Sequence, residues 1–192
     1  MVKQQKPEIR EGFKFRGGHV ALDLAATLAA RLKPAPRELL KQPRDLARWL
    51  VAAEMSDSMP EVTDADLDVA RTLRESIYSV ALARIQGRPL PESARRQLNR
   101  AAAEASAVPQ LAKDGRIHLT GKTQTLLAGI ARDAVILLGS DSSLGLRQCE
   151  GETCALLFVD TSRAGDRRWC SMSGCGNKAK VAEFRRRQRL NS

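Results

Sequence analysis

The chain has 192 residues, of which 43% are hydrophobic and 28% charged, so it can bury a core and is not a disordered polypeptide. No apolar stretch approaches the roughly 20 residues of a membrane span, and the N-terminus lacks the apolar segment of a secretory signal. The net charge of +10 is concentrated in residues 163–192, which hold nine Lys or Arg and two acidic residues. We therefore expect a cytoplasmic protein with reduced cysteines, and the local basic region predicts a polyanionic partner.

The spacing of apolar residues predicts a fold of the mainly α (α+β) class, with helices and a few short strands. Pro34 and Pro36 should interrupt the first helix, because proline blocks helical hydrogen bonding. The expected elements are a strand at Phe13–Phe15, helices at Val20–Leu32, Pro43–Met55, Thr63–Gly87, Pro91–Ala107 and Thr123–Gly139, and a strand within 114–120.

The composition changes after Gly139, where a Ser/Gly-rich stretch precedes all four cysteines and the dense arginine content. We interpret residues 1–140 as a helical domain, residues 141–146 as a linker and residues 147–192 as a small metal-binding module.

Two short patterns that resemble catalytic motifs do not hold up. Gly121-Lys122-Thr123 looks like the end of a phosphate-binding loop, but the five residues after Gly115 have the pattern of a strand, which argues against nucleotide hydrolysis. His19 and His118 lie far apart and match no triad or metalloprotease spacing. We expect a protein that is not an enzyme, and we assign no catalytic residue.

The four cysteines follow a regular pattern: a pair separated by four residues, a 15-residue spacer, and a second pair separated by four residues. Gly151 and Gly174 allow each pair to form a tight turn, so that all four sulfur atoms can meet one metal ion. Zinc suits four thiolates in a tetrahedral shell, which leaves no position for substrate water. We predict one structural zinc ion; the alternatives are an iron–sulfur cluster, a redox-active dithiol or unrelated buried thiols. The predicted zinc ligands are Cys149, Cys154, Cys170 and Cys175.

The residues around the cysteines fit a treble-clef-like module, with a β-hairpin followed by a basic helix. Ala155–Val159 is expected to form one hairpin strand, residues 160–165 the turn, and Gly176–Leu190 the helix. Val181 and Phe184 would pack on Phe158 or Trp169. The predicted nucleic-acid contacts are Lys178, Lys180, Arg185, Arg186, Arg187 and Arg189; the alternative is a solvated, solubilising tail.

This part of the chain resembles the CGNR zinc-finger family of bacterial proteins. Lys178 stands where the family usually has arginine; a lysine lacks the planar fork of arginine, so a phosphate contact is favoured there over base recognition. The matching residues are Cys149, Cys154, Phe158, Asp160, Ser162, Arg167, Arg168, Trp169, Cys170, Ser171, Met172, Cys175, Gly176, Asn177, Lys178 and Lys180.

The front of the chain is similar, more loosely, to the ABATE domain that accompanies this zinc finger. Leu24 and Ala26 replace an aromatic residue and an asparagine that relatives commonly have. The resemblance implies a stress-induced transcription regulator. The segments that carry it are Leu22–Leu24, Asp45–Leu50, Leu73–Glu75 and Ala131–Ala134.

Together these features predict a bacterial transcription regulator that binds DNA through the zinc module and senses a small molecule or dimerises through the helical domain. Asp23, Arg132 and Asp133 are the candidate ligand-binding residues, because they interrupt apolar helix patterns; a buried salt bridge would explain them equally. Two alternatives remain: a zinc-stabilised adaptor that binds protein or structured RNA, and an enzyme built on the helical domain.

Overall fold

The computed structural model describes residues 8–115 and 117–190. Residues 1–7, 116 and 191–192, which fall within the expected domains 1–140 and 147–192, lie outside this part. The helices are α1 (Val20–Ala25), α2 (Pro43–Ala52), α3 (Asp64–Ile85), α4 (Glu92–Ala103), α5 (Thr123–Gly139) and α6 (Asn177–Leu190), with short helical turns η1 (Asp141–Gly145) and η2 (Met172–Gly176). Four antiparallel hairpins pair β1 (Ile9–Arg10) with β2 (Phe13–Lys14), β3 (Leu28–Ala29) with β4 (Arg37–Glu38), β5 (Gln110–Leu111) with β6 (Ile117–His118), and β7 (Leu146–Gln148) with β8 (Leu157–Val159).

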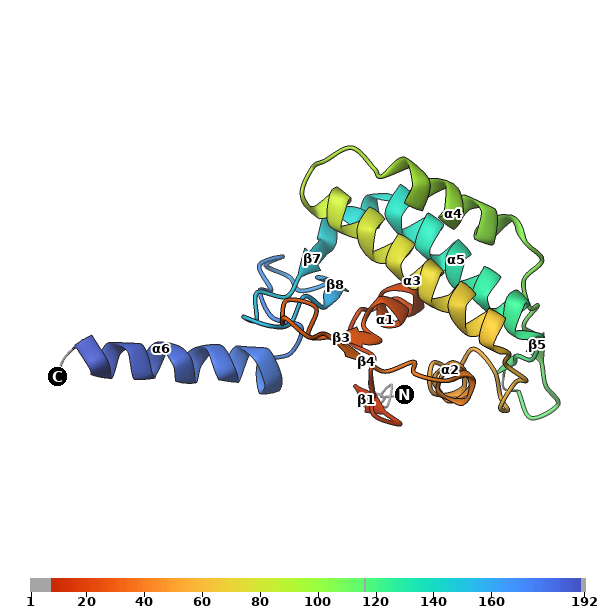
Figure 1. Cartoon of the computed structure of the whole chain (residues 1–192), viewed down its shortest axis with the longest axis horizontal. Coiled ribbons are helices and arrows are strands. Elements are labelled where there is room, and N and C mark those ends of the chain that lie inside the picture. The colour runs from red at the N-terminus through yellow and green to blue at the C-terminus, as the bar shows by residue number, and fades with distance from the viewer. Residues whose placement is uncertain (1–7, 116, 191–192) are drawn as a thin grey trace.

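The predicted mainly helical class is confirmed. Helices α3, α4 and α5 pack side by side and cover α1, while α6 extends away from this body (Figure 1). Leu22, Leu24 and Trp49 are fully buried, and Trp49 stacks on Phe15 with 6.3 Å between ring centroids. None of the described helices is long and apolar enough to cross a membrane.

Helix α3 begins where its sequence predicts. The Thr63 hydroxyl accepts a hydrogen bond from the Asp66 amide (3.1 Å), and the Asp66 carboxylate accepts one from the Thr63 amide (3.0 Å). This reciprocal capping satisfies two amides that have no partner within the helix. At the other end, Gly87 takes a φ of +61 degrees, in the left-handed region that commonly ends a helix.

The expected helix Val20–Leu32 is wrong in length, because α1 ends at Ala25. The Thr27 hydroxyl donates to the Leu24 carbonyl (2.7 Å), and such a local bond competes with helix propagation. Ala30 then takes a φ of +55 degrees, and β3 pairs with β4. The segment between them therefore forms a projecting hairpin and not the last turns of a helix.

Helices α2 and α4 also end earlier than expected, at Ala52 and Ala103 instead of Met55 and Ala107. After α4, the Arg132 guanidinium of α5 donates to the carbonyls of Ala102 (2.8 Å) and Glu104 (2.5 Å). A side chain distant in sequence thus binds the last carbonyls of α4. The local sequence pattern around α4 does not predict this contact.

The β3–β4 hairpin is attached to α3 by a buried arginine. Arg74 is 4% exposed, and its guanidinium donates to Glu38 of β4 (2.7 Å) and to Glu75 (2.8 Å). The Glu38 carboxylate also accepts from the Leu40 amide (2.8 Å). The position of the hairpin therefore depends on a network of partly buried ion pairs.

Residues 141–146, expected to form a linker, fold as η1 and the start of β7. The Ser143 hydroxyl accepts a hydrogen bond from Arg84 of α3 (2.6 Å). Leu146 of β7 and Leu157 of β8 belong to the same hydrophobic core as the helices. The β7–β8 hairpin thus packs directly on the helical body.

We predict that Arg74→Leu lowers the free energy of unfolding by about 2–4 kcal/mol, because it leaves the partly buried Glu38 carboxylate without the cation that pairs with it. Chemical denaturation of the purified protein measures this change. Arg95→Leu, which breaks an exposed pair with Glu92, is the matched control and should leave stability unaltered. Equal effects of the two substitutions would contradict the proposed role of Arg74.

Candidate metal centre and basic helix

The first pair of cysteines lies in the turn of the β7–β8 hairpin. β7 ends at Gln148, one residue before Cys149, and β8 begins at Leu157, three residues after Cys154. The expected strand at Ala155–Val159 therefore exists in shortened form, but its partner precedes the cysteines, whereas the sequence suggested a partner after them. The register Gln148↔Leu157 fixes both ends of this first cysteine turn.

The second pair lies where η2 runs into α6. The Ser171 hydroxyl accepts a hydrogen bond from the Gly174 amide (3.1 Å) and so closes the turn between Cys170 and Cys175. Arg167 donates to the carbonyls of Trp169 (2.9 Å) and Cys170 (2.5 Å) and lies over the Phe158 ring at 4.6 Å. The loop that presents Cys170 is therefore held from both sides.

The four sulfur atoms converge on one point, and all lie within 4.8 Å of one another. The Cys170 sulfur lies 3.8 Å from that of Cys154 and 3.7 Å from that of Cys175. These separations exclude disulfides, and a tetrahedral shell with zinc–sulfur bonds of about 2.3 Å has edges of about 3.8 Å. The donor set and its spacing therefore fit zinc.

Hydrogen bonds among the thiols determine which sulfur ionises most readily. The pKa of Cys149 is lowered to about 2, because the thiols of Cys154 and Cys170 donate to its sulfur. The pKa of Cys154 is raised to about 11 by its hydrogen bond to Cys149, and the pKa of Cys170 is raised by its bonds to both. Bare, the cluster accommodates one thiolate and opposes further ionisation; a bound Zn²⁺ reverses this and deprotonates coordinating thiols.

Close packing around the sulfur atoms leaves no room for larger residues. A Cβ atom at Gly151 would lie 3.0 Å from the Cys175 sulfur and 3.1 Å from Cβ of Cys154. A Cβ atom at Gly176 would lie 2.9 Å from the Met172 sulfur. A side chain at Gly151 would crowd the Cys175 sulfur, whereas one at Gly176 would require the flexible Met172 side chain to move.

The cluster has its own small hydrophobic surround, which joins it to the helical body. Phe158 is fully buried against Cys149 and Cys170, and Ala26, just after α1, packs on the same cluster. The Val159 amide donates to the Gly17 carbonyl (2.9 Å). The thiols thus lie against the residues that end α1.

The fold and site define a helical protein with a four-cysteine zinc module and an exposed basic helix. Residues 18–141 match the ABATE family, described as "Putative stress-induced transcription regulator", and residues 146–188 match the CGNR zinc finger. The chain belongs to the ABATE family and carries a CGNR zinc finger. A search of curated proteins found no match. The four cysteines hold one structural zinc ion, whose closed shell supplies rigidity and no chemistry on a substrate.

Helix α6 carries the six predicted nucleic-acid contacts, and all six side chains are exposed. Arg186 and Arg187 pair with Glu183 at 3.0 and 3.5 Å. Within residues 8–115 and 117–190 no hydrogen bond or ion pair engages the other four side chains, which are Lys178, Lys180, Arg185 and Arg189.

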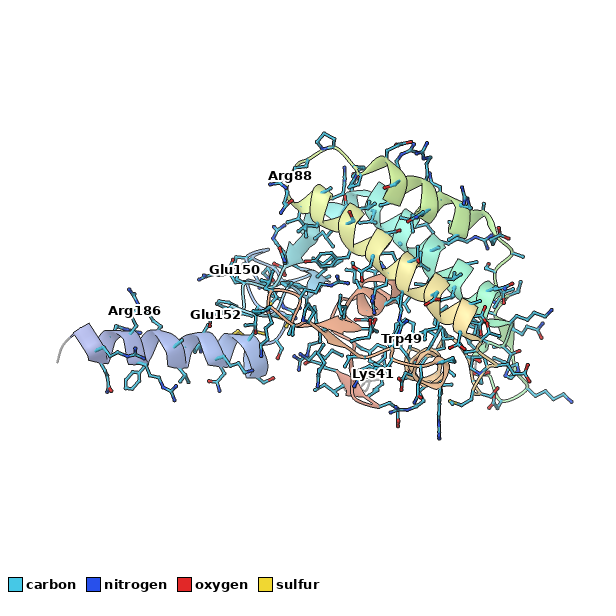
Figure 2. All side chains as sticks on the ribbon, in the orientation of Figure 1. Lys41, Trp49, Arg88, Glu150, Glu152 and Arg186 are labelled. Atoms are coloured by element: carbon cyan, nitrogen blue, oxygen red, sulfur yellow. The ribbon has the colours of Figure 1, made fainter. Side chains whose placement is uncertain are left out.

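The expected packing of α6 on the zinc module is wrong. Val181 and Phe184 are 42% and 57% exposed, and the ring of Trp169 lies beside Gly176 instead. Helix α6 extends away from the body directly after η2 (Figure 2), and both side chains are largely in solvent. Cys175 and Gly176 of η2 hold the start of α6 against the body.

The three candidate ligand-binding residues do not form one site. Asp133 accepts from His19 Nδ1 (2.9 Å) and the Ala21 amide (3.0 Å), and Asp23 accepts from the Gly17 amide (2.8 Å). These two carboxylates lie close together at the start of α1, whereas Arg132 points to the end of α4. Their role in ligand binding stays a prediction, and each makes hydrogen bonds within the chain.

Sequence reasoning missed Lys14, Lys33 and Arg37, which line the same concave surface as residues of α6. The signal that could have found the last two is the run Arg31–Arg37, whose cations flank two prolines on a segment too short for a buried element.

We predict one zinc ion per purified chain and its loss in Cys175→Ser, because three remaining thiolates leave the shell open. Elemental analysis measures the metal, and limited trypsin digestion should then cut within residues 163–190 while the helical body persists. Thr153→Ala, in the first cysteine turn, is the matched control and should keep its zinc. A metal-free wild-type protein that resisted trypsin would overturn the assignment.

We also predict a pH-dependent effect of Asp23→Asn. Burial raises the pKa of Asp23 to about 7 against an ordinary value of 3.8. The unfolded chain ionises this group first, so wild-type stability is lost as pH rises from about 4 to 7 and levels off above. Asparagine can still accept from the Gly17 amide, so the variant should gain up to ~4 kcal/mol relative to wild type over that range. Urea unfolding at pH 4 and pH 7.5 measures it, and a difference independent of pH would contradict the burial argument.

Proposed function

We propose that this protein is a transcription regulator that binds DNA through α6, with zinc fixing the helix to the body. The observation that carries the proposal is the exposure of a basic helix that starts immediately after a zinc-ligating cysteine and projects from the molecule (Figure 1). A helix held rigidly at one end loses little conformational freedom when it docks on a nucleic acid.

The distribution of side chains around α6 suits a groove of duplex DNA. At about 100 degrees per residue, Val181 and Phe184 share one stripe. Lys178, Arg185 and Arg189 flank that stripe on one side, and Lys180 and Arg187 flank it on the other. A helix about 10–12 Å across fits the ~12 Å major groove, where two basic flanks can meet the two phosphate backbones.

The helical domain would regulate this contact, either by sensing a small molecule or by dimerisation, in a cytoplasmic protein without catalytic activity. The family description of residues 18–141 supports a regulatory role. The contact between Ala26 and the cysteine cluster supports coupling, because a change at α1 would reach the base of α6.

We predict that substituting alanine for Lys178, Arg185 and Arg189 together weakens binding to a random-sequence 30-base-pair duplex. Each lost phosphate contact should lower the slope of log K against log salt by about 0.9, so the triple variant should lose roughly 2–3 in slope. Fluorescence anisotropy between 50 and 300 mM salt measures it.

The matched control removes three exposed arginines from α4, Arg95, Arg96 and Arg100, and should leave the slope within about 1 of wild type. If wild-type affinity for the duplex were negligible while a structured RNA hairpin bound tightly, the RNA-binding adaptor would replace the DNA-binding regulator.

A further inference from the structure

A concave surface lies between the helical body and α6, and nothing in the proposed function accounts for it. It has a volume of about 740 Å³ and is formed by Lys14 of β2, the β3–β4 hairpin, the first cysteine turn and residues 178–186 of α6. We call it the basic groove. Three segments far apart in sequence contribute its cations, which are Lys14, Lys33, Arg37, Lys178 and Arg186.

The carboxylates of the groove do not cancel these cations. Glu150 pairs with Arg168 at 2.6 Å, and Glu183 pairs with Arg186. In the described part of the chain no ion pair or hydrogen bond engages the side chains of Lys14, Lys33, Arg37 and Lys178, or that of Glu152, which also lines the groove. Four uncompensated positive charges therefore face one uncompensated carboxylate.

The β3–β4 hairpin holds its cations in place. Arg31 donates to both carboxylate oxygens of Glu75 (2.7 and 3.0 Å) and lies 4.0 Å over the Tyr78 ring. Pro34 and Pro36 restrict the backbone between Lys33 and Arg37. One arginine of the hairpin thus anchors it to α3, while Lys33 and Arg37 stay exposed at the groove.

The groove is continuous with the basic flank of α6. Lys178 lines the groove and shares its helix face with Arg185 and Arg189. A phosphate backbone that runs along this flank therefore reaches Lys33 and Arg37 without leaving a positively charged surface. Exposed cations without hydrogen-bond partners are typical of phosphate contacts, which depend on charge more than on fixed geometry.

We propose that the basic groove is a second nucleic-acid contact, in which the helical domain binds the phosphate backbone of the same DNA through Lys33 and Arg37. This inference rests on the proposed function of α6. It makes the helical domain part of the DNA-binding surface, so that any movement of the β3–β4 hairpin changes affinity directly.

The test is the double variant Lys33→Ala/Arg37→Ala, assayed on the same 30-base-pair duplex with zinc content measured in parallel. We expect a salt slope lower by about 1–2 and a dissociation constant raised roughly tenfold at 100 mM salt. Lys33→Arg/Arg37→Lys, which keeps both charges, should bind as wild type, and so should Arg95→Ala/Arg96→Ala. Removing the opposing carboxylate by Glu152→Gln should raise affinity twofold or more.

Other outcomes separate this inference from the function on which it rests. If the α6 triple variant loses binding while the double variant keeps it, the groove proposal fails and the proposed function stands. If neither variant changes duplex affinity, both fail. Loss of zinc from the double variant would mean that these cations serve the metal centre. If the double variant lost pyrophosphate binding but kept its DNA affinity at constant ionic strength, the groove would bind a small phosphate compound. This outcome, like the loss of zinc, would overturn the proposal.

Discussion

The convergence of four sulfur atoms within 4.8 Å is the constraint from which the C-terminal quarter of the molecule follows. Bare thiols so close together oppose one another's ionisation, whereas a divalent cation at their centre stabilises all four thiolates. Cys149 and Cys154 belong to a hairpin, and Cys170 and Cys175 to the turn that starts α6. The metal therefore joins two segments that also share a small hydrophobic cluster around Phe158, and it sets the direction in which α6 leaves the body.

The zinc module nonetheless packs directly on the helical domain and is not a separate, loosely tethered unit. Leu146 and Leu157 lie in the core of the helical domain, while Phe158, the next residue along β8, packs on the cysteines. Alternation along a strand places neighbouring side chains on opposite faces, so this one short strand contributes to two cores. The two matched families thus describe segments of one packed unit, which is why the residues after α1 can touch the metal centre.

The sequence was most informative where chemistry is local. The cysteine spacing predicted the metal centre, and Thr63 with Asp66 predicted the start of α3, because both depend on residues within a few positions of one another. Prediction failed where the deciding partner is distant: Thr27 and the β3–β4 pairing end α1, and Arg132 ends α4. The prediction that Phe184 packs on the zinc module failed for a related reason. Helical spacing shows which residues share a face, but not what that face contacts.

The arginines show the same limit most clearly. Composition counts 32 lysines and arginines, but it cannot separate those that build the fold from those that remain available to a partner. Arg31, Arg74 and Arg167 each make several hydrogen bonds to carboxylates or carbonyls, and each holds a loop or hairpin in place. Among residues 8–115 and 117–190, the side chains of the neighbouring Lys33 and Arg37 make none, although they lie in the same hairpin as Arg31. The arginines that bind within the fold hold Lys33 and Arg37 in a defined position. The distinction between these two groups of cations, which only the three-dimensional structure shows, localises the positive charge on one surface beside α6.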